Sequence, residues 1–267
     1  MVTSPIGNPQ NLLNAVNGNV LNPFITFFRY LFLPTLINLL FAYFFLRLFY
    51  RKQFVRKTFV DSPEPIKDPK LAQLSRISLV LLVVLILVKI FTVFAGLKID
   101  FRLTYIALAA ALPVILFSPK RFTVIRKIDW STLVFFAAMF ILMASVWDSG
   151  VFQNVINSTK MSLTSLPVIM GISVVLSQFI SNVPLVALYL PMLMKMGVTN
   201  SGLMALAAGS TIAGNFTILG AASNVIIIQN AEQKSGETLT FWEFIRIGMP
   251  LTVINVFVYW LFLKIIR

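Results

Sequence analysis

Three short runs of the sequence place Ser, Asn, Gly and Pro next to one another inside largely apolar stretches. They are GNPQN at residues 7–11, SNVP at residues 181–184 and GAASN at residues 220–224. Gly and Pro interrupt regular helices, and a backbone group left unpaired in hydrocarbon costs several kcal/mol. We therefore expect each run to break a membrane helix at a place where a cavity or a bound ion satisfies the freed backbone groups.

The side chains in these runs have the chemistry of an ion site. Serine hydroxyls, asparagine amide oxygens and freed backbone carbonyls are the hard oxygen ligands that small cations prefer. Backbone amides at the start of a broken helix favour an anion instead. Asn182 and Asn224 suit both ligands, because an amide is donor and acceptor. The alternative is that these small polar residues only let helices pack closely and hydrogen-bond to each other.

Composition excludes most other chemistry. The chain has no histidine, no cysteine and only nine acidic residues, most of them in predicted loops. It therefore lacks thiol nucleophiles, histidine metal sites and the acid–base pairs of an enzyme active site. We expect no catalytic residue, no cofactor and no metal beyond a sodium ion as the coupling ion. No carboxylate is predicted near the middle of the membrane, which favours an anion carrier over a sodium/proton antiporter.

The elements that must position these residues are membrane helices. Hydrophobic residues make up 58% of the chain and charged residues 12%, and a membrane span needs about 20 mostly apolar residues. Such runs are predicted at residues 24–46, 77–97, 103–117, 130–147 and 241–265. The expected fold is an all-α polytopic bundle in the cell membrane, with the lipid bilayer as partner. The net charge of +13 sits in a few loops, so it indicates a positive-inside bias rather than nucleic-acid binding.

Two basic loops set the predicted topology. If the loops around Arg56 and Arg126 are both cytoplasmic, residues near Val155 lie outside, and residues 164–196 must enter and leave on one face as a re-entrant hairpin. The expected division is therefore into three parts. These are the end of a first repeat at residues 1–46, a basic cytoplasmic linker at 47–76, and a second repeat at 77–267 that contains the hairpin and a broken helix at 200–232.

The two ends of the chain resemble each other. A Gly is followed four residues later by an Asn, and an aromatic-rich helix follows with a Phe six residues before a Pro. The matching residues are Gly7, Asn11, Phe28 and Pro34 in the first copy and Gly220, Asn224, Phe244 and Pro250 in the second. The two aromatic helices are five crossings apart if the hairpin does not cross. An odd number predicts an inverted repeat, which places transport sites near the membrane midplane.

The ordered motifs resemble those of the ion transporter superfamily, which includes arsenite-pump permeases, citrate and dicarboxylate transporters and some sodium/proton antiporters. The similar segments are TSPIGNPQN from Thr3, SQFISNVPLVALYLPML from Ser177, AAGSTIAGNFTILGAASNVIII from Ala207 and FWEFIRIGMPLT from Phe241. The resemblance implies secondary transport of a small inorganic or carboxylate anion, with Na⁺ as the coupling ion.

The resemblance also implies roles for individual residues. The residues expected to bind a cation are Ser177, Ser181, Asn182, Gly220, Ala221 and, in the first repeat, Gly7. Those expected to face the substrate are Asn182, Val183, Ala221, Ala222 and Asn224, with Asn8, Pro9 and Asn11 in the first repeat.

Two departures from the superfamily pattern leave alternatives open. Val183 stands where dicarboxylate carriers have a substrate-contacting Thr, which weakens a dicarboxylate assignment. The chain also begins at the first-repeat loop, so we expect it to be the C-terminal part of a longer transporter. A missing N-terminal half or a homodimer would then complete the site. The alternative functions are a sodium/proton antiporter and a non-transporting membrane remnant or subunit.

Overall fold

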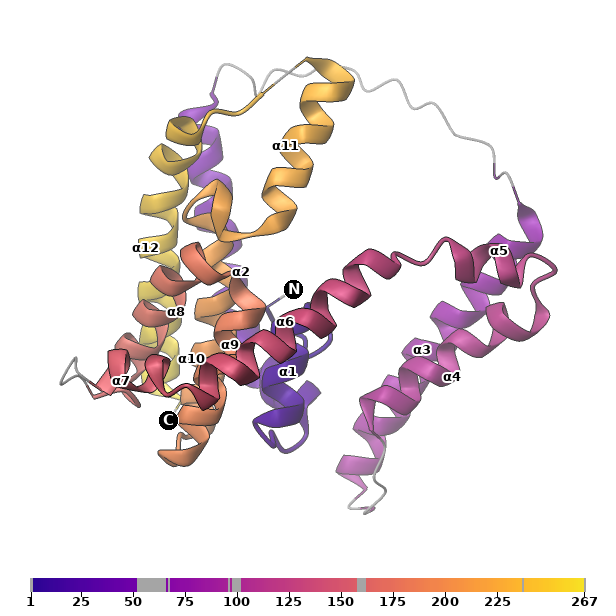
Figure 1. Cartoon of the computed structure of the whole chain (residues 1–267), viewed down its shortest axis with the longest axis horizontal. Coiled ribbons are helices and arrows are strands. Elements are labelled where there is room, and N and C mark those ends of the chain that lie inside the picture. The colour runs from indigo at the N-terminus through magenta and orange to yellow at the C-terminus, as the bar shows by residue number, and fades with distance from the viewer. Residues whose placement is uncertain are drawn as a thin grey trace. The chain divides into compact units, whose positions relative to one another are not determined.

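The structure is a computed structural model and describes residues 2–51, 66, 68–95, 97, 102–157, 162–236 and 238–266. Every regular element in these residues is a helix (Figure 1). The helices are α1 (Pro9–Asn17), α2 (Pro23–Phe49), α3 (Pro69–Phe94), α4 (Leu103–Phe117), α5 (Arg121–Arg126), α6 (Trp130–Asp148), α7 (Val151–Asn157), α8 (Leu166–Ile180), α9 (Asn182–Lys195), α10 (Asn200–Ile212), α11 (Ala222–Ser235) and α12 (Phe241–Ile265), with the short 3₁₀ turns η1 (Ala213–Asn215) and η2 (Ile218–Gly220) between α10 and α11. The prediction of an all-α membrane protein is confirmed.

Three described helices, α2, α3 and α12, are long and apolar enough to cross a membrane. Two of the predicted spans, 103–117 and 241–265, coincide with α4 and α12. Helix α3 differs, because it begins at Pro69, within the stretch that we expected to be a linker. Proline is tolerated at the first position of a helix, and Asp68 caps this end by accepting a hydrogen bond from the Leu71 amide over 3.1 Å.

The described chain forms two units. The second unit, residues 56–135, contains α3, α4 and α5, and α3 packs along α4. The Lys120 ammonium donates a hydrogen bond to the Asp68 carboxylate over 2.7 Å, and this contact holds the pKa of Asp68 below its ordinary value. Arg56 and the rest of residues 52–65 lie outside the described residues, so the predicted orientation of this loop stays a prediction.

The first unit, residues 1–55 and 136–267, is built around α10. This helix packs against α8, α9, α12, α1 and α2, and every residue from 201 to 210 is buried. Such burial on all sides suits its sequence, NSGLMALAAGSTI, because a helix without a polar face belongs in an interior. Its small residues allow neighbouring helices to approach closely.

Helix α8 approaches α10 closely at Gly209. A Cβ atom built on Gly209 would lie 2.9 Å from the Ser173 Cβ and 3.2 Å from the Met170 Cα. We therefore expect Gly209→Ala to force the helices apart and to lower the free energy of unfolding by about 1–2 kcal/mol. The matched control is Gly171→Ala in α8, whose added Cβ would meet nothing within 4 Å. Thermal unfolding in detergent measures the stability of both variants. Equal losses of stability in Gly209→Ala and Gly171→Ala would contradict the close packing at Gly209.

The helices α2 and α12, the predicted equivalents in the two repeats, lie side by side (Figure 1). Their contacts run in opposite sequence order. The Thr35 and Tyr259 hydroxyls are 2.8 Å apart, whereas the Arg246 guanidinium lies 5.8 Å from the centre of the Phe49 ring. Thus a later residue of α2 meets an earlier residue of α12, and the two helices are antiparallel, as the odd number of crossings predicts.

Candidate functional site

The chain reverses direction at Ser181, between α8 and α9. Residues 163 and 189 would be about 39 Å apart in one straight helix. Instead, the Tyr189 hydroxyl donates a hydrogen bond to the Leu163 carbonyl over 3.0 Å. Helix α9 therefore folds back along α8 as a helical hairpin. Whether this hairpin re-enters a membrane from one face stays a prediction.

Two buried oxygen atoms flank this reversal. Ser177 lies in the last turn of α8 and is fully buried, and Asn182 is the first residue of α9 with 8% of its surface exposed. Within the described part of the chain, neither the Ser177 Oγ nor the Asn182 Oδ1 has a hydrogen-bond partner. Buried polar atoms are nearly always paired, so this pair of oxygens points to a ligand.

Ser181 itself is exposed and has an unusual backbone. Its φ of 66° and ψ of 163° fall in a region that is essentially restricted to glycine and costs about 1–3 kcal/mol for other residues. We expect Ser181→Gly to relieve this strain and to raise the free energy of unfolding by about 1–2 kcal/mol. Thermal unfolding measures the change. A lower stability for Ser181→Gly would mean that the hydroxyl contributes more than the backbone strain costs.

The predicted broken helix is interrupted by the turns η1 and η2, and Gln178 of the hairpin holds this break. The Gln178 Nε2 donates hydrogen bonds to the carbonyls of Ala213 over 3.0 Å and of Val174 over 2.8 Å. Its Oε1 accepts from the Thr217 hydroxyl over 2.7 Å. One amide therefore joins the hairpin to two points of the broken segment, at the start of the turn η1 and after it.

Asn224 closes the break from the other side. Its Nδ2 donates to the Gly214 carbonyl over 2.7 Å and to the Thr217 carbonyl over 3.4 Å. Gly220 is buried there, and a Cβ on it would lie 2.4 Å from the Ala213 oxygen and 2.7 Å from the Gln178 Oε1. The loop therefore has no room for a larger residue at Gly220.

The first-repeat loop reaches the same end of α10. Asn8 caps α1 by accepting from the Asn11 amide over 2.8 Å, and its Nδ2 donates to the Thr211 hydroxyl over 3.2 Å. Asn11 is fully buried and accepts from the same hydroxyl over 3.5 Å. Thr211 and Ala213 are two residues apart, so the loop at residues 7–11 and the hairpin both contact the chain at the end of α10.

The structure brings some predicted residues together and leaves others apart. Asn8 and Asn11 share Thr211, while Gly220 and Asn224 share the break with Gln178. Gly7 makes a local turn by donating a hydrogen bond to the Ser4 carbonyl. The remaining predicted residues take varied positions: Pro9 is exposed, Val183 is buried in α9, Ala221 is half-buried before α11, and the side chain of Ala222 lies outside the described part.

Three residues that organise the site were not predicted from the sequence. These are Gln178, Thr211 and Thr217. A usable signal was present for Gln178, because it lies between Ser177 and the predicted break and carries both a donor and an acceptor. Thr211 and Thr217 carried no comparable signal, since a threonine in an apolar helix more often bonds to its own backbone, as Thr211 also does with the Ala207 carbonyl.

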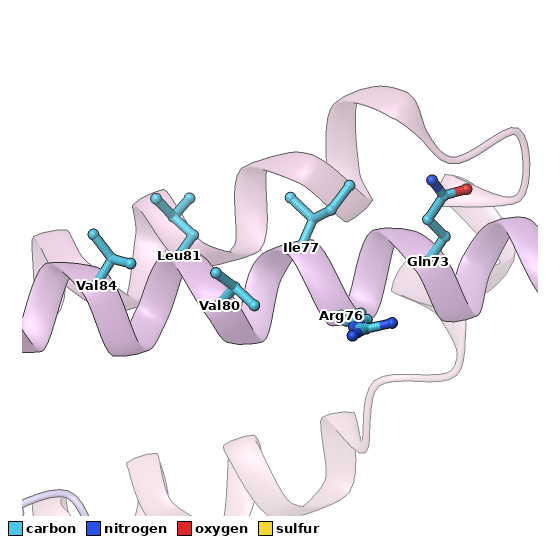
Figure 2. Close-up of a pocket in the computed structure, with 6 residues that line it drawn as sticks. All are labelled: Gln73, Arg76, Ile77, Val80, Leu81 and Val84. Carbon is cyan, nitrogen blue, oxygen red and sulfur yellow. The ribbon is translucent and has the colours of Figure 1, made fainter.

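Two surface hollows are separate from these clusters. One, of about 490 Å³, runs along α3 in the second unit and is lined by Gln73, Arg76, Ile77, Val80, Leu81 and Val84. Figure 2 shows that all six come from this single helix, so it is a helix face. The other, of about 270 Å³, lies between α1, α6 and α9, and its lining includes Asn17, Trp147 and Asp148. Neither lining contains a predicted site residue.

Several known proteins are similar to this chain. A 46 kDa membrane protein of Mycobacterium leprae is 29% identical over 161 residues, which cover 56% of this chain and 37% of that protein. The P protein of Sus scrofa is 32% identical over 149 residues, 49% of this chain and 18% of the P protein. An uncharacterised transporter of Mycobacterium tuberculosis is 28% identical over 161 residues, 56% of this chain and 37% of the relative.

The chain therefore spans only 18% to 37% of the length of these relatives. No solved structure matches it. The family model described as citrate transporter matches residues 1–202, a stretch that includes the first-repeat loop and the complete hairpin. Since this match covers well over half of the chain, the protein belongs to the citrate transporter family of membrane transporters.

Proposed function

We propose that this chain forms one of the cation-binding sites, and part of the substrate site, of a sodium-coupled carrier of small anions. The observation that carries the proposal is the pair of buried oxygens, Ser177 Oγ and Asn182 Oδ1, on the two sides of the Ser181 reversal. They are neutral, closed to solvent and without a partner in the described chain. A Na⁺ ion would give both atoms the partner that buried oxygens require.

The proposed substrate contacts are backbone amides rather than asparagine side chains. The amide nitrogens of Asn8 and Asn224 already donate hydrogen bonds within the protein. By contrast, α9 and α11 both begin without a side-chain cap and without an acidic residue in the first turn. Uncapped helix starts attract anions through free backbone amides and the helix dipole. We place the anion at these two starts, next to Asn182.

The substrate class follows from the family and from this chemistry. The family model is described as citrate transporter, and a carboxylate is well suited to the free backbone amides at an uncapped helix start. We therefore propose a small carboxylate such as citrate as the substrate. The proposal rests on a chain that covers a minor part of its relatives' length, so the proposed activity belongs to the complete transporter.

Binding to the purified full chain tests this proposal without requiring transport. We expect NaCl, compared with choline chloride, to raise the unfolding temperature, because a ligand that binds only the folded state stabilises it. Citrate should bind measurably by calorimetry in NaCl and more weakly in choline chloride. Proton-dependent Na⁺ binding without any citrate binding would support the antiporter alternative instead.

A matched pair of serine variants locates the effect. Ser177→Ala removes one of the two unpartnered oxygens and should reduce the response to NaCl. Ser145→Ala changes an exposed serine in α6, outside the hairpin and the broken helix, and should leave the response unchanged. If both variants respond as the wild type does, Ser177 is not a cation ligand.

A further inference from the structure

A second polar feature lies between α2 and α12, away from the hairpin. Both helices carry a Thr-x-x-Asn sequence, with Thr35 and Asn38 in α2 and Thr252 and Asn255 in α12. Each threonine hydroxyl donates to the carbonyl four residues earlier, Thr35 to that of Leu31 and Thr252 to that of Gly248. The same local arrangement thus occurs in the two helices that the inverted repeat relates to each other.

The antiparallel packing places the two asparagines at the same level. Thr35 of α2 contacts Tyr259 of α12. Asn38 lies one turn after Thr35 in α2, and Asn255 lies one turn before Tyr259 in α12. Residues three or four apart share a helix face, so in antiparallel helices these two steps lead to facing positions. We call Thr35, Asn38, Asn255 and Tyr259 the α2–α12 polar rung.

The amides of this rung are buried and unsatisfied. Asn38 is 6% exposed and Asn255 is 4% exposed. Within the described residues, both amide atoms of Asn38 and the Oδ1 of Asn255 lack a hydrogen-bond partner. No direct hydrogen bond therefore joins the two amides, although both are closed to solvent. The Tyr259 hydroxyl lies near Asn38 and is almost fully buried.

We propose that Asn38 and Asn255 bind one water molecule between α2 and α12. The water accepts a hydrogen bond from the Asn38 Nδ2 and donates one to the Asn255 Oδ1, with the Tyr259 hydroxyl as the third partner. Buried waters in proteins typically make about three such bonds. A cation suits the rung less well, because the Asn38 amide presents N–H donors as well as an oxygen.

The water-bridged rung would fix the register of the two repeat-related helices. In a membrane, lipid and protein interior are equally apolar, so the apolar side chains around the rung gain little from any particular register of the two helices. A buried polar pair favours one register, as a single buried asparagine does in coiled coils. Sliding α2 by one turn along α12 would leave both amides without any partner.

Leucine replacements test this proposal through thermal unfolding of the full chain. Asn38→Leu and Asn255→Leu should each lower the unfolding temperature by about 2–12 °C, because each leaves the other amide and the water without a partner. The double variant removes both polar groups, so its loss should be no greater than the larger single loss. Asn230→Leu, at an exposed position of α11, is the control and should change little.

Three results would overturn the proposal. Losses that add in the double variant would mean that the amides share no ligand. A rise in unfolding temperature with NaCl that is smaller in the double variant than in the wild type would mean that the rung binds a cation. An experimental structure that shows a direct Asn38–Asn255 hydrogen bond would exclude the bridging water. If a leucine variant does not fold, Asn38→Ser and Asn255→Ser replace it, with the same expected coupling.

Discussion

Replacement of Asn182 by alanine is expected to weaken Na⁺ binding about five- to hundredfold. A cation that enters the site gives up its water, and few protein oxygens replace that water. Removing one oxygen where solvent cannot substitute should cost about 1–3 kcal/mol of binding free energy. Since about 1.4 kcal/mol corresponds to a tenfold change in affinity, this cost gives the expected fold-change. The structure supports the choice of Asn182, because its Oδ1 is buried at the hairpin tip without a partner in the described chain.

Asn230→Ala is the matched control for this substitution. Asn230 is exposed and lies in α11. Na⁺ affinity should be measured by titration on folded, purified protein. If Asn182→Ala lowers stability but leaves the Na⁺ affinity per folded molecule unchanged, Asn182 has a packing role only.

The membrane helices could be predicted closely because their signal is simple. A long apolar run has one stable form in lipid, a helix, and α12 begins and ends where its apolar run does. The start of α3 could not be predicted in the same way. It lies within the stretch predicted to be a linker, but proline at the first helical position removes no intrahelical hydrogen bond, and the Asp68 cap favours a helix start at Pro69.

The site could be predicted only as far as residue type and local order determine it. The Ser-Asn pair and the breaks in the apolar pattern marked the hairpin and the broken helix. The partners of each polar side chain depend on tertiary packing, which no local pattern encodes. Gln178 meets Ala213 from 35 residues away, and Asn8 meets Thr211 from 203 residues away. For the same reason the sequence does not predict the α2–α12 polar rung, which depends on the antiparallel packing of the two helices.

Gln178→Leu should cost more stability than any other single substitution near the hairpin. The glutamine amide makes three hydrogen bonds, to Val174, Ala213 and Thr217, and leucine has a similar size but no polar group. The loss leaves the Ala213 carbonyl and the Thr217 hydroxyl to find other partners in a buried region. We expect the free energy of unfolding to fall by about 2–4 kcal/mol, and the unfolding temperature by about 4–16 °C.

A double-mutant cycle with Thr217→Val separates this tie from a general packing effect. Thr217→Val alone removes only the hydrogen bond to the Gln178 Oε1, so the two substitutions together should cost less than the sum of their separate effects, by about 1 kcal/mol. Gln229→Leu, at an exposed position of α11, is the control and should have little effect. Additive losses would show that Gln178 and Thr217 act independently. A coupled loss would mean that Gln178 holds the hairpin and the broken helix together as one body. A cation bound by Ser177 and Asn182 in the hairpin would then also limit the movement of the broken helix, where the anion is proposed to bind.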